Sequence, residues 1–170
     1  IDANKPNNAF KVFQPRIKDV LYEVTTLENK FLIRTNNGGA TNFRLMECAL
    51  NKTGHANWKE VIPNRKDVLL EGVEEFKDFL VLSERKDGLT QLRVRNLKDN
   101  SEHYLDFGEA AYSAWAGGNP EYNSNTLRYG YTSLTTPNST FDYNMATREK
   151  KLMKQQEVVG GYNPEDYFTE

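Results

Sequence analysis

The chain has 170 residues, a formal net charge of −2 and a pI near 5.8. This balance supplies no basic field to hold phosphates, so nucleic acid is excluded as an expected partner. No apolar run approaches the roughly 18–20 residues that cross a bilayer, so no membrane partner is expected either.

The single cysteine and the first residues indicate the compartment of the protein and whether the sequence begins at a natural amino terminus. Cys48 is the only cysteine, which excludes an internal disulfide and favours a reducing, cytoplasmic location. The chain opens at Ile1 without an initiator methionine or an apolar leader. We interpret it as a piece of a longer protein.

A repeat organises the sequence. Residues 29–33, Asn-Lys-Phe-Leu-Ile, return as residues 77–81 and again as residues 125–129, with a spacing of 48 residues. A second set of anchors, Phe43, Leu92 and Phe141, is spaced by 49 residues. A strand-rich repeat of roughly 40–50 residues is typical of a four-stranded β-propeller blade. The sequence therefore predicts an all-β chain with about three four-stranded antiparallel blades.

The elements follow in chain order. Residues 1–16 are predicted to end a preceding blade, with an edge strand at 10–15. The three full blades are predicted at residues 17–63, 64–108 and 109–157, followed by a linker at 158–170 that contains Gly160-Gly161. The innermost strands are expected at residues 21–27, 68–75 and 112–117, and the closing edge strands at residues 58–63, 103–107 and 151–155.

Each blade has a central hairpin signalled by its turn residues. These are Asn36-Asn37-Gly38-Gly39, Lys86-Asp87-Gly88 and Thr136-Pro137-Asn138. The strand before the turn is apolar on both faces, which predicts burial between neighbouring blades. The strand after the turn alternates, and we expect its buried face to carry Phe43 and Leu45, Leu92 and Val94, and Phe141 and Tyr143 in turn.

Candidate catalytic residues are few. His55 lies in a polar loop and His103 begins an edge strand, and nothing in their surroundings indicates a catalytic triad. Glu74 and Glu75 resemble a glycosidase pair, but adjacent strand residues point to opposite faces, so we interpret them as a solvated turn. A metal site needs several Cys, His or carboxylate ligands that converge, and the chain has one cysteine and two histidines far apart in the sequence. We therefore expect no catalytic, cofactor-binding or metal-binding residue.

Two larger groups of side chains leave alternatives open. The aromatic residues could stack on a sugar, although packing between blades is favoured; they are Tyr104, Tyr112, Trp115, Tyr122, Tyr129, Tyr131 and Tyr143. The recurring arginines could form ion pairs at the surface or between blades, or could contact another domain or line a tunnel; they are Arg34, Arg85, Arg93, Arg95 and Arg128.

The third repeat and the tail carry a family resemblance. Residues 127–137, Leu-Arg-Tyr-Gly-Tyr-Thr-Ser-Leu-Thr-Thr-Pro, and residues 154–167 resemble the last propeller blade of the prolyl oligopeptidase family, and within it the oligopeptidase B (protease II) subfamily. Residues 2–6, 31–36 and 81–89 agree with this resemblance, which covers essentially the whole chain.

The resemblance implies a two-part parent in which a seven-bladed propeller caps an α/β-hydrolase domain with a Ser-Asp-His triad. The parent would be a serine endopeptidase that cleaves short peptides after Lys or Arg and needs no cofactor. This chain would be the C-terminal part of the propeller, would gate substrate, and would pair with the hydrolase domain. It contains no Gly-x-Ser-x-Gly nucleophile motif, so we expect it to be inactive alone.

Two further expectations follow from an incomplete ring. Three blades cannot close a propeller, so the chain is expected to form an open arc that self-associates through uncovered blade surfaces. The alternative function is a propeller scaffold that binds a protein or carbohydrate ligand without catalysis.

Overall fold

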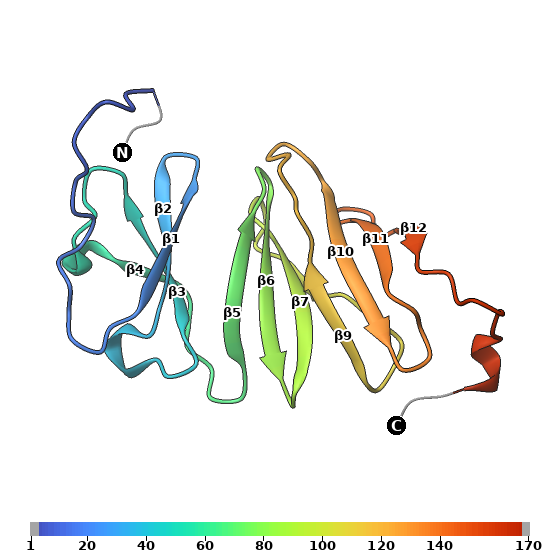
Figure 1. Ribbon diagram of the computed structural model, residues 1–170. Helices are drawn as coiled ribbons and strands as arrows, with labels where there is room; N and C mark the ends of the chain where they lie inside the picture. Colours follow the sequence, from blue (N-terminus) through green and yellow to red (C-terminus); the bar gives the residue numbers. More distant parts are fainter. Residues whose placement is uncertain (1–3, 168–170) are drawn as a thin grey trace. The chain divides into compact units, whose positions relative to one another are not determined.

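The computed structural model describes residues 4–167, which form three four-stranded antiparallel sheets (Figure 1). The expected all-β fold of three blades is confirmed. Residues 1–3 and 168–170, which hold the chain opening and the end of the predicted linker, lie outside the described residues. Within the described residues, no helix is both long enough and apolar enough to cross a membrane. The chain divides into two compact units, Ile1–Asn64 and Arg65–Glu170.

The first unit holds one sheet in the order β1-β2-β3-β4. Its strands are Tyr22–Leu27, Lys30–Thr35, Arg44–Ala49 and Lys59–Ile62, and short 3₁₀ turns occupy Asn37–Gly39 and His55–Asn57. A small core packs Ile33, Met46, Cys48 and Trp58 against one another. The predicted inner and edge strands of this blade are therefore present.

The second unit holds two sheets. The strands of the first sheet are β5 Leu69–Glu75, β6 Phe79–Lys86, β7 Leu89–Asn96 and β8 Glu102–Tyr104. The strands of the second sheet are β9 Tyr112–Ala116, β10 Thr126–Ser133, β11 Ser139–Asn144 and β12 Lys150–Gln155, and a 3₁₀ turn follows at Pro164–Asp166. The edge strand expected at residues 103–107 is shorter than predicted, since regular pairing ends at Tyr104.

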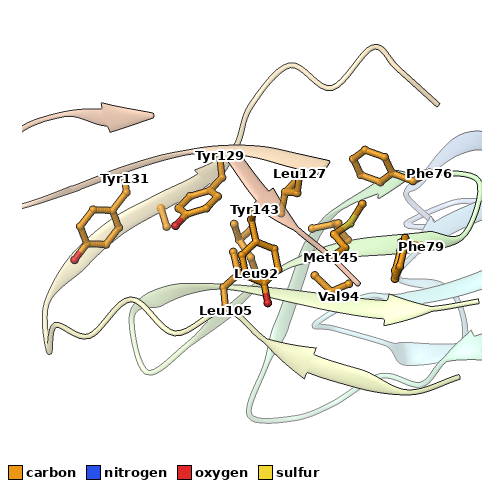
Figure 2. Packing of buried hydrophobic residues seen from close by; sticks show 12 residues of the cluster. Phe76, Phe79, Leu92, Val94, Leu105, Leu127, Tyr129, Tyr131, Tyr143 and Met145 are labelled. Carbon is orange, nitrogen blue, oxygen red and sulfur yellow. The ribbon is translucent and has the colours of Figure 1, made fainter. Parts of the chain in front are cut away.

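One large core joins the two sheets of the second unit (Figure 2). Val81 and Val94 from one sheet meet Leu127, Tyr129 and neighbouring residues from the other, and all four are at most 1% exposed. Tyr131 and Tyr143 are also buried there, so packing between blades is confirmed for these aromatic residues. Burial of apolar area in this cluster stabilises the pair of blades.

The tight turn of the second blade is confirmed. Lys86 pairs with Leu89, and the two residues between them, Asp87 and Gly88, have φ of 50° and 83°. Positive φ at both positions is the geometry of a two-residue hairpin turn. In the first blade the predicted hairpin is also present and both Gly38 and Gly39 have positive φ, but Thr35 pairs with Arg44, so the connection is longer than the four predicted turn residues. Asn36 anchors this connection, since its side chain accepts a hydrogen bond from the Leu21 backbone N–H at 2.8 Å.

This longer connection shifts the pairing of the first blade relative to the repeat. Ile33, Val81 and Tyr129 pair with Met46, Val94 and Phe141. The anchors Phe43, Leu92 and Phe141 are therefore not equivalent positions. Leu45 is buried as expected, and Met46 on the opposite face of the strand is buried as well, with exposed fractions of 1% and 8%. A shift of one residue moves every side chain of a strand to the other face.

The segment at residues 10–15 does not form the expected strand. No strand within the described residues pairs with it, and Phe13 instead packs edge-on against Phe31, with ring centroids 5.1 Å apart. Its assignment to a preceding blade, like the other domain boundaries, stays a prediction.

Candidate functional site

The two histidines have neutral partners. The His55 ring lies 2.7 Å from the Asn37 amide nitrogen, and the His103 ring lies 2.8 Å from the Tyr143 hydroxyl. Neither ring contacts a serine or a carboxylate among residues 4–167. The structure thus brings together no Ser-His-Asp arrangement around them, and the expectation that neither is catalytic stays a prediction.

His103 links the second blade to the third through its hydrogen bond with Tyr143, and we expect it to make folding sensitive to pH. Burial, together with the charge of Arg148, lowers the pKa of His103 below its usual value. The folded state therefore binds fewer protons than the unfolded state. Stability should be fully present above about pH 6.5 and should fall as the pH drops through the folded-state pKa.

We expect His103→Gln to flatten this part of the pH profile. Glutamine keeps a polar partner for Tyr143 but does not titrate, so at pH 8 the variant should lie within about 1 kcal/mol of the parent chain. Urea unfolding between pH 5 and pH 8 measures the difference, and His55→Gln is the matched control. Parallel profiles for the parent chain and His103→Gln would contradict the assignment.

The acidic pair lies in a strand and not in a solvated turn, which corrects the interpretation of the sequence. Glu74 and Glu75 are half-buried in β5 and pair with Val81 and Leu80. Burial raises the pKa of Glu74. A hydrogen bond that the Asn119 side chain donates at 2.7 Å acts in the opposite direction but is the smaller effect. As expected of adjacent strand residues, the two carboxylates cannot flank one bond.

The recurring arginines form ion pairs inside their own blades. The closest pairs join Arg34 to Glu23, Arg85 to Glu71, Arg93 to Glu84, Arg95 to Glu102 and Arg128 to Asp142. Ion pairing is thus confirmed for this group, although each pair lies within a blade. Tyr104 and Trp115, with exposed fractions of 42% and 43%, are the most exposed of the candidate aromatic residues.

The Glu84 cluster, which comprises Glu84, Arg93, Tyr104, Glu102 and Arg65, is an ion network that the sequence did not reveal, and only Glu84 and Arg93 in it are buried. Glu84 is 1% exposed and accepts hydrogen bonds from Arg93 and from the Tyr104 hydroxyl. Burial opposes the charge of Arg93, but the carboxylates of Glu84 and Glu102 outweigh it and raise its pKa. The sequence feature that could have indicated this cluster is a charged residue, Glu84, that follows an apolar run in the same strand.

Glu109 is a second polar centre that was missed. Its carboxylate accepts hydrogen bonds from the hydroxyls of Tyr131 at 2.6 Å and of Thr135 and Thr136 at 2.8 Å each. Burial would raise the pKa of Glu109, but hydroxyl donors, including Ser133, outweigh it and lower the pKa to about 2. Through these hydrogen bonds the Glu109 carboxylate links the β10–β11 connection to the segment before β9.

The remaining chemistry is sparse. Cys48 is buried, and burial, followed by the charge of Glu47, raises the pKa of its thiol, which disfavours the reactive thiolate. Among residues 4–167, no three His, Cys, Asp or Glu side chains are grouped closely enough to hold a metal ion. The described residues form four-stranded blades with internal ion pairs.

Repeated four-stranded antiparallel sheets, two of which pack face to face in the second unit, define a β-propeller type of domain. Residues 1–156 match the family described as "Prolyl oligopeptidase, N-terminal beta-propeller domain". The chain belongs to this family.

Relatives support this assignment. The chain is 42% identical over 161 residues to dipeptidyl aminopeptidase BI of Pseudoxanthomonas mexicana, covering 95% of the chain and 22% of the relative. It is 30% identical over 170 residues to protease 2 of Moraxella lacunata, covering all of the chain and 24% of the relative. The chain thus spans less than a quarter of the length of these two relatives.

Solved structures agree with this picture. Oligopeptidase B from Trypanosoma brucei, described in a closed form with covalently bound antipain, has a TM-score of 0.81 at 29% identity over 89% of this chain and 22% of that one. Oligopeptidase B from Leishmania major has a TM-score of 0.80 at 27% identity, with the same coverage of both chains. The expected resemblance to oligopeptidase B is confirmed.

Proposed function

We propose that this chain is a substrate-gating part of a propeller in a serine-type peptidase that acts on short peptides. The observation that carries the proposal is the match of residues 1–156 to the N-terminal propeller domain of a peptidase family. A propeller that closes over a catalytic domain excludes folded proteins and water from the reaction. The trypanosomal oligopeptidase B in its closed form supports such a movement.

The catalytic groups are proposed to lie in another part of the polypeptide. The chain holds no Gly-x-Ser-x-Gly motif, and its two histidines contact Asn37 and Tyr143. The 170-residue chain alone should therefore be inactive. A reducing compartment such as the cytoplasm is proposed from the lone, buried cysteine.

Two relatives suggest different specificities for the whole protein. The likeness to oligopeptidase B supports cleavage after Lys or Arg, whereas the name of the 42% identical relative describes removal of dipeptides from an amino terminus. We propose endopeptidase cleavage after Lys or Arg, which requires no free amino terminus. The two activities differ in whether a blocked substrate is accepted.

The test uses two fluorogenic substrates with the same Arg-Arg sequence, one with a blocked amino terminus and one with a free amino terminus. The natural polypeptide that carries this chain should cleave both, and the isolated 170-residue chain should cleave neither above a buffer blank. Cleavage of only the free substrate would instead assign a dipeptidyl aminopeptidase. Turnover by the isolated chain would contradict the gating role.

A further inference from the structure

A pocket in the first blade has a positively charged rim. It lies where β3 ends and β4 begins, beside the β1–β2 turn, and has a volume of about 540 Å³. Lys30, Lys52 and Lys59 line it together with a single carboxylate, that of Glu47, and we call it the lysine pocket. Its lining carries an excess of two positive charges, although the whole chain has a net charge of −2. A pocket of this size can hold a small organic molecule.

Two of the lysines have no carboxylate partner. The Lys30 ammonium group binds Glu47 at 2.7 Å, whereas neither Lys52 nor Lys59 forms an ion pair with any residue between 4 and 167. Among the described residues of the lining there is no arginine, whose planar fork would match a carboxylate. Separate ammonium groups are point charges, and a phosphate monoester can offer an oxygen to each of them.

The wall of the lysine pocket is partly apolar. Trp58 and Cys48 line it and are only 8% and 5% exposed, and Ala49 and Ala56 lie beside them. An inorganic anion would bind the lysines but would leave this apolar wall in contact with water. A ligand with an apolar or aromatic body next to its anionic group would cover the wall and gain from its burial.

The β3–β4 connection that forms one side of the pocket is long but ordered. It spans residues 50–58, whereas the matching connections of the other two blades span only residues 97–101 and 145–149. The Trp58 indole N–H donates to the Thr53 carbonyl at 2.8 Å, and the His55 backbone N–H donates to the Gln14 side chain at 2.6 Å. Because these bonds fix the wall in advance, little conformational entropy is lost when a ligand binds.

We propose that the lysine pocket binds a small phosphate monoester with an aromatic or apolar body. The ammonium groups of Lys30, Lys52 and Lys59 hold the phosphate, and the wall around Trp58 holds the body of the ligand. The site does not depend on the proposed peptidase activity, since every residue that lines it belongs to the first compact unit of this chain.

The two tryptophans of the chain provide the readout for a test with phenyl phosphate. At pH 8, where this phosphate monoester is a dianion, it should shift the indole N–H signal of Trp58 in NMR spectra of the 170-residue chain, and the shift should saturate. Trp115, on β9 outside the pocket, is the internal control, and its signal should not move. A shift that does not saturate, or an equal shift of both indole signals, overturns the proposal.

Two further ligands test the chemistry of the site. Inorganic phosphate lacks the ring and should bind about fivefold more weakly than phenyl phosphate. Phthalate keeps a ring and two negative charges but presents carboxylates, and it should also bind more weakly. Inorganic phosphate that bound as tightly as phenyl phosphate would mean an unspecific patch of lysines. Phthalate that bound more tightly would mean a carboxylate site, and either result overturns the proposal.

A matched pair of double variants tests the lysines. Lys52→Gln combined with Lys59→Gln should weaken the binding of phenyl phosphate about fivefold or more, because two ammonium partners are lost. Lys151→Gln combined with Lys154→Gln removes the same charge from exposed positions of β12 outside the pocket and should leave the affinity within about twofold. Equal affinities of the two double variants would overturn the proposal. The unchanged Trp115 signal shows that each variant is folded.

Discussion

Replacing Arg93 by alanine is expected to lower the free energy of unfolding by about 3–5 kcal/mol. The substitution leaves the Glu84 carboxylate, which is 1% exposed, with the Tyr104 hydroxyl and an Arg65 nitrogen 3.7 Å away. A buried charge that loses its main partner carries the full cost of its desolvation. Urea unfolding of the isolated chain at pH 7 measures the loss.

Arg128→Ala is the matched control for this prediction. Arg128 also binds its carboxylate partner through two bonds, at 2.7 Å and 2.8 Å to Asp142, but its side chain is 50% exposed. Because water screens this pair, its loss should cost far less stability than the loss of Arg93. Equal losses for the two arginines would contradict the assigned role of burial.

A double substitution tests the cause of the loss. Glu84→Leu combined with Arg93→Met removes both charges and keeps apolar volume, so it should recover most of the stability lost in Arg93→Ala. A double variant as unstable as the single one would mean that side-chain packing around Arg93, and not the isolated carboxylate, accounts for the loss.

Leu127→Ala is expected to cost about 2–5 kcal/mol, because it opens a cavity in the core between the second and third blades. Leu127 is fully buried in the cluster that also holds Tyr143 and Met145 (Figure 2). The measurement is the midpoint of urea unfolding, followed by tyrosine fluorescence and by circular dichroism.

Leu134→Ala provides the comparison, since it removes the same atoms from a side chain of the same blade that is 89% exposed. Its effect should stay within about 0.5 kcal/mol. If Leu127→Ala were equally mild, the cluster would not hold the two blades together in solution.

The strands and turns of the second blade could be read from the sequence because their signals are local. Alternating apolar residues and Asp87-Gly88 specify a hairpin within a few residues. The register of the first blade could not be read, since it depends on a connection held by Asn36, whose partner Leu21 lies 15 residues away. The pairing of Glu84 with Arg93 was missed for another reason. The two residues are only nine apart across one hairpin, but the residue pattern does not show which charged side chain is buried.

The spacing of the sequence repeat does not predict which face of a strand is buried. Val81 and Tyr129 are 48 residues apart and occupy matching positions in the repeat, yet both pack into the same core between two sheets. Two blades stacked in the same orientation contact each other through opposite faces of their sheets. The repeat spacing therefore aligns the strands of the two blades, but it does not show to which face each side chain points. A difference of one residue in a turn or bulge is enough to move the side chains of the next strand to the other face of the sheet.

The sequence by itself determined the repeat, the four-stranded blades and the family, because each depends on residue order along the chain. Only the tertiary structure decided how the strands pair, which carboxylates pair with which arginines, and that Glu109 binds the hydroxyls of the β10–β11 connection. These features depend on side-chain contacts across strands and between segments, where a shift of one residue in register moves a side chain to the other face of the sheet.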